Sequence, residues 1–290
     1  MGMTFHEFGA SDAPVLVLFH PLGVWWDTFE YVIPTLSERY RVVIPAMPGH
    51  DPEQPATHYT SVEQVADEAA DWLIAHGHAR VRCLYGCSMG GAVVTRLLAL
   101  GRVQPDCAVI DGGITPYRLP QPLPVLICVR DFIMTELGKH LSLSALRGVF
   151  DPDRYSQADI EYIHKVLRFM SPRTIWRGFY SANNYAMPHP VPPLRCRAQY
   201  WYGEREKKEC KWDIEYIQSA FPTIEVVEQP EQGHAEGFAL YPELFCQRLI
   251  AFIEAGNSVQ AKRIRTASRS KKGGAAAPYT QRVGMEKEYG

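Results

Sequence analysis

The sequence predicts an α/β fold in which helices cover both faces of a mostly parallel central sheet. Short apolar runs that suit buried strands alternate with stretches of helical periodicity along most of the chain. The run at 15–19 is apolar at every position, which is typical of a parallel strand covered on both sides. One long segment without a clear strand interrupts the alternation and predicts an all-helical cap inserted between strands of the sheet.

The elements follow in a regular order before and after that segment. Strands are expected at 4–8, 15–19, 41–45, 81–85, 107–111, 198–202 and 224–227. Helices are expected at 25–40, 61–74, 92–100, 210–220 and 238–254, and within the insertion near 125–138, 142–149, 156–169 and 171–184. Ser61 is placed to cap the helix that follows it.

The pattern divides the chain into four parts. A core is predicted in two pieces, 1–115 and 194–255, with the cap at 116–193 and a tail at 256–290. The tail lacks apolar periodicity, so we expect it to be disordered. Its eight Lys or Arg and two Glu give a net charge of +6; because the whole chain carries −2, residues 1–255 carry −8.

This charge distribution and the cysteine pattern limit which partners and which cellular compartment are expected. An acidic body argues against nucleic acid as a partner, although the basic tail could serve as an arm for an acidic one. Seven scattered cysteines with no Cys-x-x-Cys pair predict reduced thiols in a cytoplasmic protein, with neither a disulfide framework nor a zinc site. No apolar run approaches the ~20 residues of a membrane span. Monomer and dimer both stay open.

The motif Gly86-Cys87-Ser88-Met89-Gly90 stands between an expected strand and an expected helix. In that context Gly-x-Ser-x-Gly predicts a sharp turn that holds a serine in strained backbone geometry with its Oγ exposed. The two glycines remove Cβ atoms that would collide where the strand and the helix pack closely. Ser88 is therefore the candidate nucleophile.

A serine hydroxyl needs a base within hydrogen-bond reach and a third group that orients the base. The candidate base is His234, in the loop between the last expected strand and the last helix. The candidate acid is Glu206, three residues after Gly203 at the end of a strand, and Asp111 at another strand end is its rival. Either carboxylate could fix the tautomer of the imidazole.

An oxyanion hole requires two backbone N–H groups. The first is expected from Met89, which follows the nucleophile, and the second from Leu22 in the loop after the 15–19 strand. Because both groups belong to the main chain, the side chains of these two residues matter little for the hole. His20, at the start of the same loop, is expected to make structural hydrogen bonds.

Together these residues resemble the α/β-hydrolase fold superfamily of esterase- and lipase-like serine hydrolases, over roughly residues 4–255. The motifs that carry the resemblance are His20-Pro21-Leu22-Gly23, Pro48-Gly49-His50, Gly86-Cys87-Ser88-Met89-Gly90-Gly91, Gly203-Glu204-Arg205-Glu206 and Gly233-His234. The order of nucleophile, acid and histidine is that of the superfamily. Two positions depart from its usual pattern, because Pro21 stands where glycine is common and Glu206 where aspartate is.

The resemblance implies acyl transfer to water without a cofactor or a metal. Ser88 would attack an ester carbonyl, His234 would pass the proton to the leaving group, and water would hydrolyse the acyl-enzyme. The superfamily also holds thioesterases, lactone and C–C bond hydrolases, peroxidases, acyltransferases and ligand receptors that do not turn over, so the fold alone does not choose among them.

Aromatic residues of the cap suggest the substrate class. Trp176 and Tyr180 in the cap, with Trp25 after the oxyanion loop, are expected to line a pocket for a small to medium apolar acyl or aryl ester. The alternative is that these rings only pack the cap on the core. The expected partner is therefore a small-molecule ester.

Overall fold

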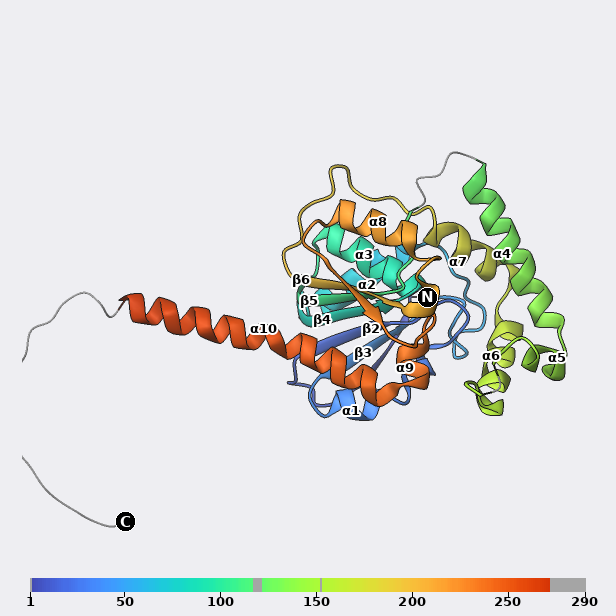
Figure 1. Ribbon diagram of the computed structural model, residues 1–290, viewed down its shortest axis with the longest axis horizontal. Coiled ribbons are helices and arrows are strands. Elements are labelled where there is room, and N and C mark those ends of the chain that lie inside the picture. The colour runs from blue at the N-terminus through green and yellow to red at the C-terminus, as the bar shows by residue number, and fades with distance from the viewer. Residues whose placement is uncertain (1, 117–121, 152, 272–290) are drawn as a thin grey trace, which may run out of the picture.

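The computed structural model of the protein describes residues 2–116, 122–151 and 153–271. Its centre is a seven-stranded sheet with the order β1-β3-β2-β4-β5-β6-β7 (Figure 1). The strands are β1 (Thr4–Phe8), β2 (Val15–Phe19), β3 (Arg41–Ala46), β4 (Arg80–Cys87), β5 (Gln104–Asp111), β6 (Arg197–Gly203) and β7 (Glu225–Gln229). Only β1 pairs in the antiparallel sense within this sheet, and the other six strands are parallel. The predicted fold class is confirmed.

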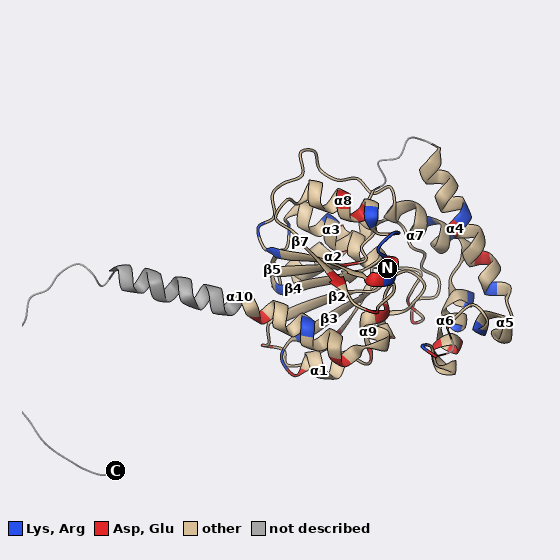
Figure 2. Ribbon diagram, in the orientation of Figure 1, with Lys and Arg blue, Asp and Glu red and all other residues tan. Residues whose placement is uncertain are grey.

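Helices cover both faces of the sheet. Those of the core are α1 (Ile33–Ser37), α2 (Val62–Ala75), α3 (Met89–Leu100), α8 (Lys211–Ala220), α9 (Glu236–Leu240) and α10 (Pro242–Lys271), with short 3₁₀ helices η1 (Trp26–Phe29) and η2 (Glu204–Glu206). Figure 1 shows α2, α3 and α8 on one face and α1, α9 and α10 on the other. Lys, Arg, Asp and Glu gather on the outer helices, the loops and the strand ends (Figure 2).

Strand β2 shows why an uninterrupted apolar run is needed at the middle of such a sheet. Val15, Val17 and Phe19 point into the core beneath α2 and α3, whereas Leu16 and Leu18 point into the core beneath α1 and α10. Successive side chains of a strand point to opposite faces, so a strand covered on both sides must be apolar at every position.

The insertion between β5 and β6 contains α4 (Leu123–His140), α5 (Leu143–Arg147), α6 (Gln157–Phe169) and α7 (Pro172–Ala182). These helices lie together at one end of the sheet (Figure 1). Trp25, after the carboxyl end of β2, packs with Val166, Met170 and Ile175 of the insertion in a small apolar core. The insertion therefore sits over the edge at which the parallel strands end.

Two of the predicted helices are each divided into two shorter helices in the structure, and a proline explains each break. The helix expected at 25–40 is divided into η1 and α1, because Pro34 has no N–H and its ring would clash with the preceding turn of a continuous helix. The helix expected at 238–254 is divided at Tyr241, whose backbone leaves the helical region directly before Pro242.

The tail also differs from the expectation. Helix α10 continues to Lys271, although disorder is predicted from residue 256. Ala, Lys, Arg and Gln in this stretch favour helix by intrinsic propensity, which does not depend on an apolar stripe. The rest of the predicted tail, 272–290, lies outside the described residues. Within the described ranges, no helix is both long and apolar enough to cross a membrane.

Candidate active site

Ser88 occupies a strained turn between β4 and α3. Its φ of 53° and ψ of −115° are unusual for a residue with a side chain. The turn is held by main-chain hydrogen bonds: the Ser88 N–H donates to the Asp111 carbonyl at 2.8 Å, and the Ser88 carbonyl accepts from Ile114 N–H at 3.2 Å. The ends of β4 and β5 thereby fix the position of the serine, which is 6% exposed.

The flanking glycines permit the close packing that this turn requires. A Cβ placed on Gly86 would lie 2.2 Å from the Gly90 carbonyl oxygen, and one on Gly90 would lie 2.2 Å from the Phe19 carbonyl oxygen. Both separations are far below van der Waals contact. The glycines thus let the first turn of α3 lie directly against the ends of β4 and β2, as the sequence predicts.

His234 and Glu206 form a hydrogen-bonded pair at the same edge of the sheet. The Nδ1 atom of His234, in the loop between β7 and α9, lies 2.5 Å from Oε2 of Glu206 in η2. The other carboxylate oxygen of Glu206 accepts the Gly203 N–H at 2.8 Å. The Glu206 side chain is 9% exposed, whereas that of His234 is 47% exposed.

The two partners shift each other's pKa in opposite directions. Burial would raise the pKa of Glu206, but the hydrogen bond and the charge of His234 outweigh it and lower this pKa. Partial loss of hydration would lower the pKa of His234, but its hydrogen bond to Glu206 and that carboxylate's charge raise it. Glu206 is therefore ionised at neutral pH and can accept a hydrogen bond from Nδ1–H of His234, which fixes the orientation of the imidazole.

Gly112 connects the pair to the serine turn. A Cβ on this residue would lie 3.0 Å from Nδ1 of His234 and 3.4 Å from Oε1 of Glu206. Gly112 directly follows Asp111, whose carbonyl accepts the Ser88 N–H. The imidazole therefore lies over the residue next to the serine turn, and the bare Cα at position 112 leaves room for it.

Asp111, the alternative acid, faces another group. Its Oδ2 accepts the Tyr85 hydroxyl at 2.5 Å, in the interior beneath the sheet edge. Burial raises the pKa of Asp111 to about 7, against which the Tyr85 hydrogen bond acts. Since Nδ1 of His234 is directed at Glu206, the geometry favours Glu206 over Asp111 as the group that orients the histidine.

The loop predicted to supply an oxyanion-hole N–H is held by His20, which is buried. Its Nε2 accepts the Met47 N–H at 3.2 Å, so its Nδ1 carries the proton and donates to the Pro21 carbonyl at 2.9 Å. Burial lowers the pKa of His20 to about 4 and keeps the ring neutral. In a planar trans peptide the C=O and N–H point in opposite directions. The Leu22 N–H is therefore aimed away from His20. This arrangement uses the carbonyl of residue 21 and not its N–H, so a proline can occupy the position.

The predicted pocket aromatics make packing contacts. Trp25 is 5% exposed and meets Phe169 edge-on at 5.4 Å between ring centroids. Trp176 stacks on Tyr180 at 5.9 Å, and Tyr180 is 43% exposed. The first contact joins the insertion to the core, and the second lies within α7. Pocket lining by the three rings stays a prediction.

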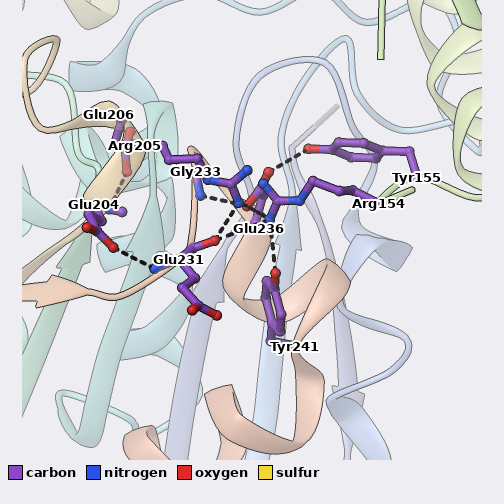
Figure 3. Close-up of polar contacts among 10 residues, drawn as sticks. Arg154, Tyr155, Glu204, Arg205, Glu206, Glu231, Gly233, Glu236 and Tyr241 are labelled. Atoms are coloured by element: carbon purple, nitrogen blue, oxygen red, sulfur yellow. Dashed lines mark hydrogen bonds and ion pairs between the residues drawn. The ribbon is translucent and has the colours of Figure 1, made fainter. Parts of the chain in front are cut away.

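Several residues around the site carry no sequence signal. Gly178 of α7 packs against Leu22, because a Cβ there would lie 2.6 Å from Cδ1 of Leu22. Glu236, two residues after His234, is a buried carboxylate bound by arginines from two other segments (Figure 3). Its surroundings form only when segments far apart in the sequence meet, and no spacing pattern in the chain reports them.

Comparisons with known proteins agree with this architecture. The alpha/beta hydrolase family matches residues 16–248. An alpha/beta hydrolase family protein from Desulfitobacterium hafniense superposes with a TM-score of 0.68 at 22% identity, over 86% of this chain and 99% of that one. An esterase from Thermogutta terrifontis superposes with a TM-score of 0.66 at 17% identity, over 88% and 93%. At these identities the likeness shows the fold alone.

A curated relative matches a shorter stretch. The magnesium-chelatase 30 kDa subunit of Rhodobacter capsulatus is 36% identical over 114 residues, which are 39% of this chain and 39% of that protein. The match thus spans about two fifths of the relative's length. The extent of the family match, together with the sheet order and the serine turn, leads to one conclusion: the chain belongs to the alpha/beta hydrolase family.

Proposed function

We propose that this protein is a serine hydrolase that cleaves a carboxylic ester through an acyl-enzyme on Ser88. The single observation that carries the proposal is the 2.5 Å contact between Nδ1 of His234 and Glu206, beside the strained serine turn. A serine between a strand and a helix needs an oriented base to become nucleophilic. The pairing of His234 supplies the orientation.

The first half of the reaction forms the acyl-enzyme. His234 takes the hydroxyl proton on Nε2 while Oγ of Ser88 attacks the carbonyl carbon, and Glu206 stabilises the resulting imidazolium. The oxyanion receives hydrogen bonds from the Leu22 and Met89 N–H groups, each typically worth about 2.7–4 kcal/mol in the transition state. When the C–O bond breaks, His234 returns the proton to the departing alcohol.

The second half releases the acid. Water loses a proton to Nε2 of His234 as its oxygen attacks the acyl carbon, and collapse of the tetrahedral adduct breaks the bond to Ser88. His234 then gives that proton back to the serine oxygen. The positive end of the α3 dipole lies beside the oxyanion in both halves, because α3 begins directly after Ser88.

An apolar acyl or aryl group of small to medium size is the proposed substrate class. Trp176 and Tyr180 of the insertion and Trp25 after β2 support it, because aromatic rings over the serine suit an apolar group. The esterases among the structures of similar fold are consistent with this class.

A panel of p-nitrophenyl esters from acetate to long chains, assayed with the wild type and Ser88→Ala, tests the proposal. Serine-dependent turnover supports it, and the preferred chain length measures the acyl pocket. Absence of turnover with Ser88 still labelled by a fluorophosphonate would indicate a competent nucleophile for another substrate. Absence of labelling as well would contradict the hydrolase and favour a ligand receptor of the same fold.

A further inference from the structure

The carboxylate of Glu236 is the meeting point of a buried polar network (Figure 3). Its Oε2 accepts the Gly233 N–H at 2.6 Å, Nη2 of Arg154 at 2.6 Å and Nη2 of Arg205 at 3.1 Å. Its Oε1 accepts the Tyr155 hydroxyl at 3.2 Å. The Glu236 side chain is 8% exposed and that of Arg154 is 13% exposed.

The partners of Glu236 come from three segments. Gly233 immediately precedes His234, and Arg205 immediately precedes Glu206. Arg154 and Tyr155 belong to the insertion, between α5 and α6. One carboxylate therefore touches the loop of the candidate base, the turn of the candidate acid, and the insertion that covers the strand ends.

The two arginines also share a second acceptor. The Glu231 carbonyl accepts Nη2 of Arg154 at 3.4 Å and an Nη2–H of Arg205. Arg154 further donates to the Tyr241 hydroxyl at 3.0 Å, between α9 and α10. The insertion is thus anchored on both sides of the loop that carries His234.

The charge balance of this network depends on Glu236. Its carboxylate is the anion between two guanidinium groups that approach the same oxygen atom. Replacement by a neutral amide of equal size would leave the two cations facing each other without an anion between them, and this repulsion pushes them apart. Arg154 is 13% exposed and Arg205 45% exposed, so water screens the charge of Arg205 more than that of Arg154. Arg205 would move the turn of Glu206, and Arg154 would move the insertion.

We propose that Glu236 is a positioning residue that couples the seating of the helical insertion to the alignment of the His234–Glu206 pair. This inference rests on the proposed function, in which that pair activates Ser88. Only Ala235, in a left-handed conformation with φ of 60°, separates His234 from Glu236, so we expect a shift of Glu236 to displace the imidazole.

Glu236→Gln is the decisive variant, and Glu231→Gln is its matched control. The control makes the same chemical change in the same loop, but Glu231 contributes only its main chain to the network (Figure 3). The readouts are the rate constant for fluorophosphonate labelling of Ser88, normalised to the labelled endpoint, and the low-field proton NMR signal of His234 Nδ1–H. The endpoint counts folded sites, so a loss of folded protein does not alter the rate constant.

Glu236→Gln should lower the labelling rate constant and kcat by about ten- to a hundredfold, the effect of a misplaced catalytic group, and should displace the proton signal. Glu231→Gln should leave both unchanged. Arg154→Ala should act in the same direction, and the double variant should lose less than the product of the two single losses, because both remove one network. Arg154→Lys, which keeps the charge but loses the planar fork, supplies the test if Glu236→Gln does not fold.

An unchanged rate constant and an unchanged proton signal in Glu236→Gln would overturn the inference while leaving the proposed hydrolase intact. The opposite failure is also visible. If the wild type is not labelled at all, yet Glu236→Gln displaces the proton signal and Glu231→Gln does not, then the proposed function fails and the positioning role of Glu236 stands.

Discussion

Oε2 of Glu206 lies 2.5 Å from Nδ1 of His234, although 27 residues, including α8 and β7, separate the two in the chain. The contact leaves Nε2 as the imidazole nitrogen available to a serine proton. Glu206 also accepts the Gly203 N–H at the end of its own strand, so a second contact, independent of the histidine, holds the carboxylate in place. This arrangement suits a carboxylate that orients the histidine.

Ser88→Ala should abolish turnover of any ester that the wild type hydrolyses. The proposed triad of Ser88, His234 and Glu206 acts as a unit, so the expected loss in kcat is on the order of 10⁴–10⁶. Stopped-flow or long-time assays with p-nitrophenyl esters measure it, and circular dichroism of the variant controls for folding. Activity within about tenfold of the wild type would contradict the mechanism.

Glu206→Gln should impair kcat far more than Asp111→Asn. The amide at position 206 removes the charge that stabilises the imidazolium, whereas an amide at position 111 can still accept the Tyr85 hydroxyl. Steady-state kinetics of the two variants on one ester give the ranking. The reverse order would assign the acid to the end of β5.

The pH profile of kcat/KM should rise through a pKa above the ordinary value of about 6.5 for histidine. His234 must be neutral to accept a proton, and its hydrogen bond to Glu206 and the charge of that carboxylate raise its pKa despite the partial loss of hydration. Activity is therefore lost as the pH falls below the raised pKa. In Glu206→Gln the midpoint should move to lower pH; a midpoint that stays in place would show that Glu206 does not set it.

Gly86→Ala should destabilise the fold by about 1–3 kcal/mol, the usual cost of overpacking. The new Cβ would meet the carbonyl of Gly90, which is main chain and cannot rotate away. Gly138→Ala is the control, because that position in α4 has no neighbouring atom within 4 Å of a Cβ. Urea unfolding should show a loss for the first variant and a gain of up to about 1 kcal/mol for the second, from helix propensity.

Removal of residues 256–290 should leave ester hydrolysis intact. All groups proposed for catalysis precede this segment, and so do the buried residues of α10 in the core beneath the sheet, among them Phe245, Leu249 and Ile253. Kinetics of the truncated and full-length proteins provide the comparison. A truncated chain that folds but has lost function would support the alternative in which the basic tail is the functional arm.

The sequence predicts features that consecutive residues create. Alternating strands and helices, the apolar run of β2 and the glycines around Ser88 all act between near neighbours, and the structure confirms the fold that they predict. The errors lie at prolines 34 and 242, where a pattern of apolar residues continues but the backbone cannot.

Choices among distant groups required the tertiary structure. Asp111 and Glu206 both follow strands in the sequence, and only the packed loops show that His234 faces Glu206 while Asp111 turns to Tyr85. Glu236 gave no signal, because its partners Arg154 and Arg205 lie far from it in the sequence and meet it only in the folded chain. By itself, the sequence determined the sheet and the serine turn, since these depend on local sterics and on the burial of regularly spaced apolar side chains. The tertiary structure decided which charged groups meet, since charges from distant segments become neighbours only once the sheet has brought their loops to one edge.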